Sequence, residues 1–301
     1  MKVLCIGHSS YDITVPVPEY PVENFKYRIE NCLYAGGGPA ANAAYLLGKW
    51  GIDTTFVGMI GYDTYGSSIK QEFKTVNVDT TFLETDYESK TSTSFIVINE
   101  QSGSRTVFNC ANSHPQIKKF KFEINPDAIL VDGHQFEASK FALTRYPNAI
   151  SIIDAGRATK EVMDLCKLVK YLVCSKEFAE TVSGIKIDYN DPKTLTNVYT
   201  DLQNKYKNSI IVVTLEDKGA LYAFDKVIKI LPSIKKEKIL DTTGAGDIFH
   251  GAFTYAIVNG YDLEKAIKIS NITAGISTTR MGARLSIPEL SEILEYYESH
   301  Q

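Results

Sequence analysis

The second half of the chain alternates short apolar segments with helical patterns, and this alternation constrains the fold more than any other feature of the 301-residue sequence. Apolar runs of four or five residues occur at 128–131, 150–153, 171–174 and 210–214. Helical patterns of apolar residues lie between these runs, at 136–146, 160–169 and 192–206. Buried strands that alternate with helices predict an α/β fold with a mainly parallel sheet covered on both faces.

The remaining segments extend this pattern at both ends of the chain. Residues 2–6 read as a first buried strand, and a later hairpin is expected at 219–231. Three further helices are expected at 244–259, 263–280 and 288–298. Two regions do not fit the alternation. Residues 13–34 contain three prolines, which exclude a helix, and residues 91–110 alternate around a turn, as a β-hairpin does.

The strongest local motif is Asp-Thr-Thr-Gly-Ala-Gly-Asp at residues 241–247, which leads directly into an apolar run. Glycines and hydroxyl residues before such a run indicate a loop that begins a helix. The first amides of a helix lack partners and carry partial positive charge, so they suit an anion, and glycine lets it come close. Asp247 would repel that anion unless it has a chemical role, such as taking a proton from a hydroxyl. The simpler alternative is an acidic residue favoured at a helix start.

This motif and the Phe-x-Gly-Ala-Phe that follows at 249–253 strongly resemble the C-terminal signature of the ribokinase-like (PfkB) sugar kinases, and the resemblance covers nearly the whole chain. It implies that Asp247 is the catalytic base. It also implies that the amides of Gly244, Ala245 and Gly246 form an anion hole for the transferred phosphoryl group. The implied architecture is one ribokinase-like domain over residues 1–301. The segments 13–34 and 91–110 would form a small β-sheet lid over the sugar and the contact of a homodimer.

Residues for the sugar come from the first part of the chain. Asp12 follows the first strand, where open α/β sheets place ligand-binding residues, although a turn aspartate fits its spacing equally well. Residues 37–42 match the family's Gly-Gly-x-x-x-Asn signature. The resemblance therefore implies that Gly37 and Gly38 allow close approach of the sugar, and that Asp12 and Asn42 bind its hydroxyls.

Two further residues are assigned to the same substrate. Arg105 lies in the lid hairpin, and His134 ends a strand, where it could reach the sugar. A histidine at a strand end is more often structural. Around them, residues 98–106 and 132–134 look closest to the ketohexokinase branch, which favours a neutral ketose or another pentose or hexose.

Three alternatives stay open for the function. A sugar phosphate would need cations in the lid, for which the candidates are Lys26, Arg28, Lys90 and Arg105, although any of these suits a solvated surface. A nucleoside would need an aromatic slot, for which the candidates are Tyr11, Phe95 and Phe108. A sensor that binds a sugar or nucleotide without turnover would keep the same fold.

The resemblance assigns ATP to the later part of the chain. The residues assigned are Thr214, Glu216, Gly219, Thr243, Asn271, Ala274 and Gly275. Glu216 stands where the family's Thr-Leu-Gly-x-x-Gly loop has glycine, so the backbone could differ there. The small residues of the penultimate helix suit close helix packing equally well. No Gly-x-x-x-x-Gly-Lys-Ser/Thr sequence occurs, so the chain does not read as a P-loop kinase.

Metal sites are implied in two places. Glu177 is the candidate for indirect contact with Mg²⁺, although Cys174 or Ser175 stands where relatives carry asparagine. A solvated glutamate at a helix start is the alternative for Glu177. Asp241, Thr243 and Gly282 are the candidates for a monovalent cation such as K⁺.

Composition excludes several other classes. The net charge of −4 gives no basis for binding nucleic acid or acidic membranes, and no apolar run has the length of a membrane helix. The short apolar N-terminus reads as a strand and not as a signal peptide. The five cysteines form no C-x-x-C pair, so we expect free thiols and a cytoplasmic protein.

Overall fold

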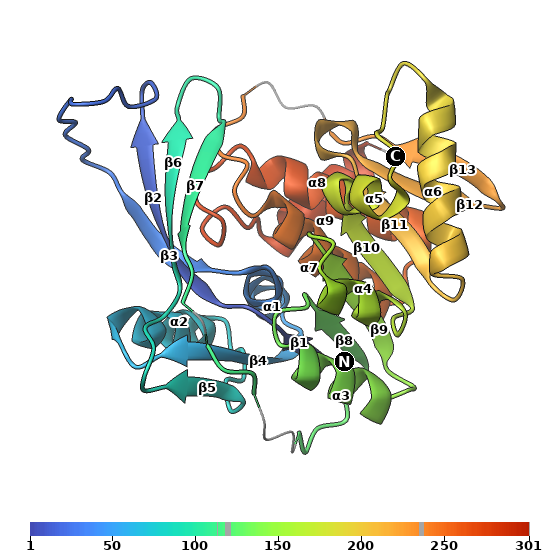
Figure 1. Ribbon diagram of the computed structural model, residues 1–301, viewed down its shortest axis with the longest axis horizontal. Helices are drawn as coiled ribbons and strands as arrows, with labels where there is room; N and C mark the ends of the chain where they lie inside the picture. Colours follow the sequence, from blue (N-terminus) through green and yellow to red (C-terminus); the bar gives the residue numbers. More distant parts are fainter. Residues whose placement is uncertain (113, 118–121, 235–237, 301) are drawn as a thin grey trace.

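The computed structural model describes residues 1–112, 114–117, 122–234 and 238–300 and is built on a nine-stranded sheet (Figure 1). In spatial order its strands are β13 (Val227–Leu231), β12 (Ala220–Phe224), β11 (Ile210–Thr214), β10 (Tyr171–Ser175), β9 (Ile150–Ala155), β8 (Ala128–Val131), β1 (Lys2–Ile6), β4 (Asp53–Gly61) and β5 (Leu83–Asp86). The strands from β11 to β5 are parallel, and β12 and β13 add an antiparallel edge. The predicted α/β architecture is confirmed.

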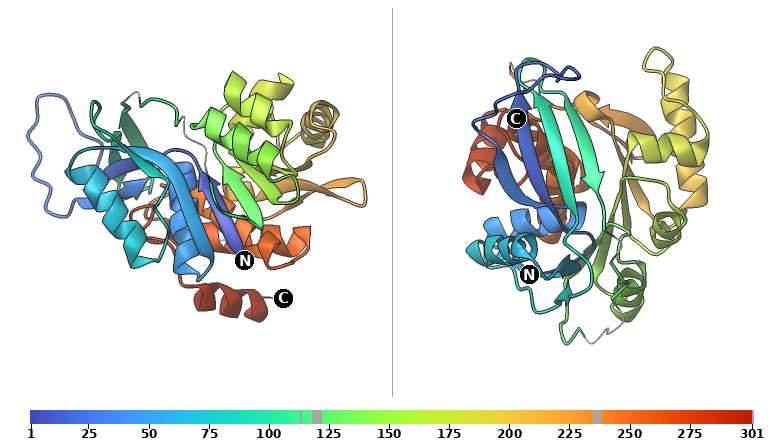
Figure 2. Two further views of the ribbon diagram at one scale, coloured as in Figure 1. Left: turned by 90° about the horizontal axis from the view of Figure 1, so that it is seen from below. Right: turned by 60° about the vertical axis from the view of Figure 1, so that its left-hand side comes forward.

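Helices cover both faces of this sheet (Figures 1 and 2). One layer contains α1 (Pro39–Lys49), α7 (Ala245–Val258), α8 (Leu263–Ser277) and α9 (Leu290–Ser299). The other contains α3 (Phe136–Arg145), α4 (Lys160–Cys166), α5 (Lys176–Ser183) and α6 (Pro192–Lys205). Because strand side chains alternate, β1 supplies Val3 and Cys5 to the first core and Leu4 and Ile6 to the second.

A second, four-stranded sheet has the order β3 (Leu33–Gly37), β2 (Ser10–Val17), β6 (Thr93–Asn99) and β7 (Arg105–Cys110). It stands beside the main body, and we call it the lid sheet (Figure 1). The regions expected to form a lid supply it. The sequence interpretation differs at Asp12, which lies within β2 and not in a turn after β1. Strand β2 ends at Val17, and it contains Pro16.

The register of the lid sheet sorts its side chains onto two faces. Asp12 is aligned with Ser94 and Asn109, so these three share a face. Phe95 and Phe108 are aligned with each other and lie on the opposite, outer face. At the tip of the hairpin, Arg105 contacts Thr242 of the 241–247 loop. The inner face therefore covers the beginning of α7.

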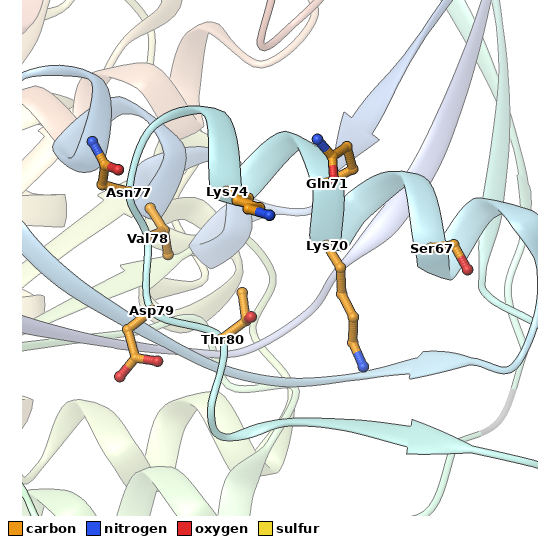
Figure 3. A pocket seen from close by; sticks show the side chains of 8 residues that line it. All are labelled: Ser67, Lys70, Gln71, Lys74, Asn77, Val78, Asp79 and Thr80. Carbon is orange, nitrogen blue, oxygen red and sulfur yellow. The ribbon is translucent and has the colours of Figure 1, made fainter.

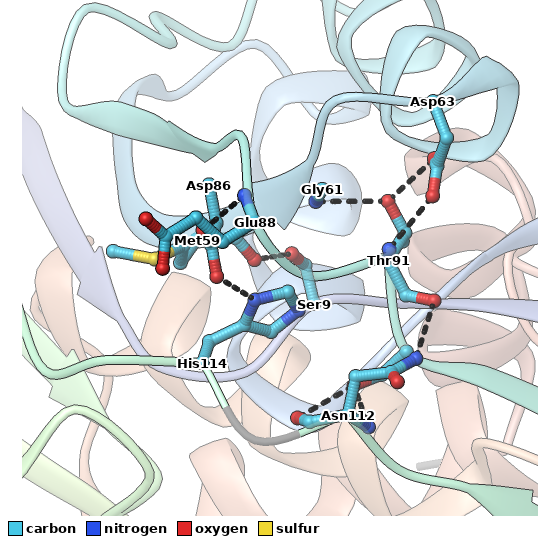
Figure 4. A network of polar contacts seen from close by, with 10 residues as sticks. Ser9, Met59, Gly61, Asp63, Asp86, Glu88, Thr91, Asn112 and His114 are labelled. Atoms are coloured by element: carbon cyan, nitrogen blue, oxygen red, sulfur yellow. Dashed lines mark hydrogen bonds and ion pairs between the residues drawn. The ribbon is translucent and has the colours of Figure 1, made fainter.

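Hydrogen bonds tie both ends of the β6–β7 hairpin to the body (Figure 4). Asp63 caps helix α2 (Thr64–Thr75), and its carboxylate also accepts from the amide and the hydroxyl of Thr91, at 2.8 and 2.7 Å. The Asn112 amide donates to the Thr91 carbonyl at 3.2 Å. The lid sheet is thus anchored at its base, where β6 begins and β7 ends.

Two elements were not expected from the sequence, namely β5 and α5. Helix α5 begins because the Ser175 hydroxyl accepts from the Phe178 amide as an N-cap. All five cysteines are free thiols. Within the described ranges, no helix combines the length and apolar character needed to cross a bilayer.

Candidate active site

The 241–247 loop ends at the N-terminus of α7, as predicted. Gly244 is the N-cap residue with φ of 73°, a left-handed conformation that favours glycine, and no side chain caps the helix. The amides of Gly246 and Asp247 donate to no acceptor among the residues that the structure describes. A Cβ added at Gly246 would meet no atom within 4 Å. Open space and free amides at a helix start are what an anion site requires.

Asp241 holds this loop in place. Its carboxylate accepts from the Thr243 amide and from the Gly282 amide, both at 2.8 Å, and its side chain is buried. The three residues predicted for a monovalent cation therefore lie together. The Thr243 hydroxyl is buried and has no hydrogen-bond partner in the described part of the chain. Such an orphaned oxygen beside a carboxylate suits a cation ligand.

Asp247, in the first turn of α7, is a half-buried carboxylate at the centre of the site. The Asn42 side-chain amide donates to it at 2.7 Å, which joins the N-terminal and C-terminal motifs across 205 residues of sequence. Burial and the nearby charge of Asp154 raise the pKa of Asp247 to about 7, although the hydrogen bond from Asn42 and the charge of His250 oppose this. The negative charge of Asp12 also acts on it. A carboxyl group with a pKa near neutrality suits a general base.

His250 and Asp154 are site residues that the sequence did not single out strongly. The Nδ1 atom of His250 lies 2.6 Å from the Gly246 carbonyl and 3.2 Å from the Asp154 carboxylate, and its Nε2 atom lies 3.2 Å from the Val173 carbonyl. Both ring nitrogens of His250 thus face oxygen atoms of the protein. The position of His250 one turn after Asp247 was the available sequence signal.

The glycines before α1 have a different role from the one predicted. A Cβ at Gly37 would overlap the Asp12 carboxylate, and one at Gly38, where φ is 99°, would overlap the His8 carbonyl. A Cβ at Gly36 would overlap the guanidinium of Arg284. The missing side chains therefore make room for groups of the protein itself. These neighbouring groups alone are enough to explain the glycines. Close approach of a sugar to Gly37 and Gly38 stays a prediction.

The structure brings Asp12 to the same site. Its carboxylate lies against Gly37, immediately before the helix that carries Asn42, and accepts from the Ser10 hydroxyl at 3.2 Å. Burial raises the pKa of Asp12. Asp12, Asn42 and Asp247 thus form one continuous polar cluster built from β2, α1 and α7.

His134 lies at the edge of this cluster. Its Nδ1 atom is 3.2 Å from the carboxylate of Asp132, which also accepts from the amides of His8 and Ala40. The charge of Asp132 raises the pKa of His134. The His134 side chain is 54% exposed, so one side of the ring is accessible to a ligand.

The lid cations do not converge on one point. Arg105 reaches Thr242, whereas Lys90 precedes β6 at the other end of the hairpin. Lys26 and Arg28 lie in the exposed segment between β2 and β3, and Arg28 faces Glu30 at 3.7 Å. A phosphate site made by these four side chains is not assembled in this structure.

The aromatic slot suggested for a nucleoside is also absent from the inner face, as far as the described residues show. Tyr11 stacks on Tyr65 of α2, with ring centroids 4.8 Å apart, and alternates with Asp12 along β2. Phe95 and Phe108 lie on the outer face, opposite the acceptor side. These rings do not surround the space beside Asp12.

The predicted nucleotide residues lie at the β11 end of the same sheet edge. Glu216 keeps a left-handed backbone with φ of 55°, so the loop retains a conformation that glycine would favour. Asn271 donates to the carbonyls of Leu231 and Pro232, at 3.0 and 3.2 Å. Both hydrogens of the Asn271 side-chain amide are therefore used within the protein, and its contact with adenine stays a prediction.

The other residues of this group are placed as follows. Gly275 packs against Ile234, where a Cβ would overlap the isoleucine side chain, so helix packing explains it. The Thr214 hydroxyl donates to the Cys174 carbonyl at 3.3 Å. Glu177 lies in the first turn of α5, at the carboxyl end of β10, and is exposed. Its carboxylate makes no hydrogen bond or ion pair with the described residues and is free to face a hydrated metal ion.

Comparison with known proteins decides the family. A family model described as pfkB family carbohydrate kinase matches residues 1–290. The chain belongs to the pfkB family. Within it, this pfkB chain is 28% identical to a ribokinase of Staphylococcus aureus, over 97% of this chain and 98% of the relative. It is 26% identical to a nucleoside kinase of Methanocaldococcus jannaschii, over 100% of this chain and 98% of the relative.

A solved structure has the same fold. The ribokinase of Arabidopsis thaliana complexed with ribose and ATP superimposes with a TM-score of 0.79, at 20% identity, and covers 98% of this chain and 97% of the other. This pfkB chain is therefore a ribokinase-fold phosphotransferase of the carbohydrate kinase class.

One surface pocket of the described chain lies away from this pfkB site. It has a volume of about 590 Å³ and lies between α2 and residues 77–80 (Figure 3). Lys70, Lys74 and Asp79 are among its lining residues, and none of the predicted site residues lines it. A second pocket of about 430 Å³ includes His134. None of Asp12, Asn42 and Asp247 is among the residues that line this second pocket.

Glu216→Gly and Gly219→Ala are expected to change the free energy of unfolding to different extents. Glycine removes the cost of a left-handed glutamate, so Glu216→Gly should leave the free energy of unfolding within about 1 kcal/mol of wild type. At Gly219, φ is 100° and a Cβ would overlap the Leu231 carbonyl, so alanine should cost about 2 kcal/mol or more. Urea denaturation of both variants measures the difference. Equal stability of the two variants would contradict this account of the loop.

Proposed function

We propose that this pfkB kinase transfers the γ-phosphoryl group of ATP to a hydroxyl group of a neutral sugar. The observation that carries the proposal is the half-buried Asp247 beside the free amides of the α7 N-terminus, hydrogen-bonded to Asn42 and within the electrostatic range of Asp12. This arrangement supports a proton acceptor, an anion site and hydroxyl-binding groups in one place. Similarity to a ribokinase supports the choice of a sugar.

In the proposed mechanism, Asp12 and Asn42 orient the acceptor so that one hydroxyl faces Asp247. Asp247 takes the proton of that hydroxyl as the oxygen forms a bond to the γ-phosphorus. The bond between this phosphorus and the bridging oxygen of ADP breaks, and ADP leaves. The amides of Gly244, Ala245 and Gly246 stabilise the negative charge of the transferring group.

Two metal ions fit the residues present. Mg²⁺, with Glu177 facing its water ligands, would neutralise the charge of the ATP phosphates. K⁺ would suit the Asp241 carboxylate, the orphaned Thr243 hydroxyl and the loop at Gly282, and would stabilise the fold of the anion-binding loop. Asp241 already orders this loop through its two hydrogen bonds.

The charge distribution favours a neutral acceptor. The charges that act on Asp247 include those of the carboxylates Asp154 and Asp12. The Arg284 guanidinium, which lies near Asp12, is paired with Glu72 at 2.8 Å. A phosphate group on the acceptor would face these carboxylates and be repelled. The four cations of the lid region also do not converge on one point where they could bind such a phosphate.

A panel of acceptors tests the proposal. ADP release from ATP and Mg²⁺ is measured with free pentoses and hexoses, both ketoses and aldoses, and with sugar phosphates and nucleosides. We expect turnover with at least one free sugar. Turnover with nucleosides and with no free sugar would identify a nucleoside kinase. Similarity to a nucleoside kinase makes this the second candidate. Thermal stabilisation by ligands without ADP release would identify a sensor.

The outer face of the lid sheet suits a homodimer contact. Tyr34, Phe95 and Phe108 are 56%, 43% and 58% exposed there, and β7 is an edge strand. Exposed aromatic rings beside an unpaired strand edge favour association. Light scattering after gel filtration would show a dimer, and Phe108→Glu should shift it to a monomer.

A further inference from the structure

A chain of hydrogen bonds leads from the base to a buried arginine that the sequence did not single out. The Arg284 Nε atom donates to the Asn42 Oδ1 atom at 3.1 Å, and Asn42 donates in turn to Asp247 at 2.7 Å. The Arg284 Nη1 atom donates to Glu72 at 2.8 Å. Four residues from α2, the 282–287 segment, α1 and α7 are thus connected in series.

We propose that Arg284 is a positioning residue that fixes the orientation of the Asn42 amide, so that Asn42 presents its NH₂ group, and not its carbonyl, to Asp247. The proposal rests on the proposed function, because it concerns Asp247 as the base. The argument follows from donor and acceptor chemistry. Arginine can only donate hydrogen bonds, and an ionised carboxylate can only accept them. An asparagine between the two satisfies both in one orientation only.

The orientation matters because it selects the protonation state of Asp247. An N–H donated to a carboxylate stabilises its ionised form, whereas a carbonyl oxygen facing it stabilises the protonated form. The other groups that act on Asp247 are Asp12 from β2, Asp154 from β9 and His250 from α7 itself. The two carboxylates favour a protonated Asp247 by raising its pKa, whereas the hydrogen bond from Asn42 lowers this pKa.

Arg284 is built into the core firmly enough to do this. It is 2% exposed, and its guanidinium lies between the rings of Phe73 and Tyr45, 4.7 and 5.4 Å from their centroids. Gly36 makes room for it, and the Gly36 amide donates to both oxygens of Glu72, at 2.9 and 3.0 Å. Packing and the ion pair with Glu72 therefore fix the direction of the Nε–H bond.

Arg284 is a poor choice for stability alone. Its Nη2 atom is buried without a hydrogen-bond partner among the described residues. Burying an unsatisfied donor on a charged group is costly, and apolar residues often replace buried ion pairs without loss of stability. The bond to Asn42 gives the arginine a role that an apolar residue could not fill.

The test compares the pH dependence of kcat in wild type and Arg284→Met. Methionine removes all donors, so Asn42 is free to rotate, and the acidic limb of the profile should move up by about one pH unit. Arg284→Gln retains an amide donor and should stay close to wild type. In an Asn42→Leu background, Arg284→Met should shift the limb no further. Arg145→Met, at the surface of α3, is the control for an arginine-to-methionine change.

Distinct results separate the possible failures. If the limb of Arg284→Met coincides with that of wild type, the proposal is wrong, and the assignment of Asp247 as base is unaffected. If Asp247→Asn keeps wild-type turnover, the proposed function itself fails. Where Arg284→Met does not fold, Glu72→Gln is compared with Glu72→Gln/Arg284→Met, because the double variant leaves no unpaired carboxylate beside Gly36.

Discussion

Asp247→Asn is expected to lower kcat by about 10²–10⁴ and to leave the KM of the acceptor nearly unchanged. Asparagine keeps the size of the side chain and can accept the hydrogen bond from Asn42, but it cannot take a proton. Acceptor binding depends on Asp12 and Asn42, which the substitution leaves in place. Steady-state kinetics at about pH 8 measure both constants. A variant that retains most of the wild-type kcat would show that another group acts as base.

The same variant is expected to be more stable than wild type above neutral pH. The folded-state pKa of Asp247 is raised to about 7 from 3.8, so the folded protein holds an extra proton between these values. The free energy of unfolding of wild type therefore falls as pH rises through this window. Asparagine carries no buried charge, so the variant should gain on the order of 2 kcal/mol at about pH 8. The difference should shrink toward about pH 4, as urea denaturation across the range would show.

Gly244→Ala is expected to lower kcat by about 10²–10³, the effect of losing one donor of an anion hole. Gly244 has a φ of 73°, and a Cβ there would lie 2.6 Å from the Cβ of Ala283. Relieving this contact must move the loop that aims the Gly244–Gly246 amides. Single-turnover kinetics at saturating ATP separate this loss from weaker nucleotide binding.

Gly260→Ala provides the matched control for Gly244→Ala. Gly260 follows the other end of α7 and has a similar φ of 78°, but a Cβ there would meet no atom within 4 Å. Alanine at either position should lower the free energy of unfolding by about 1–2 kcal/mol, because its backbone would have to be left-handed. Only Gly244→Ala should lose activity. An equal fall of kcat in both variants would mean that helix stability, and not loop position, controls the rate.

The sequence predicted the architecture because the signals for it are local. Apolar runs such as 171–174 and 210–214 identify buried strands by themselves, and the 241–247 loop identifies a helix start. The association of Asp12 with Asn42 and Asp247 followed from family resemblance. The structure shows a hydrogen bond between Asn42 and Asp247 across 205 residues of sequence, and the charge of Asp12 acts on Asp247. The ketohexokinase branch was a finer prediction that the comparisons with ribokinases and a nucleoside kinase do not show.

The residues that sequence reasoning missed depend on distant partners. Arg284 is significant only because Glu72 and Asn42 lie against it, and neither is near it in the chain. The same holds for His250, whose side chain faces Asp154 of β9 and the Val173 carbonyl of β10. Gly37 and Gly38 were predicted to leave space for a sugar because glycine shows that space exists, but not which group fills it. Only the three-dimensional structure supplies that group.

The anchoring of the lid hairpin at Thr91 and Asn112 determines how the cleft can open. If the lid sheet rotates about its anchored base, the displacement of each residue grows with its distance from that base. Ser94, beside Asp12, is near the anchored end, whereas Arg105, beside Thr242, is at the free end. A small rotation that breaks the contact between Arg105 and Thr242 would therefore widen the space over the 241–247 loop more than the space beside Asp12. Under the proposed function, we expect ADP to leave before the phosphorylated product.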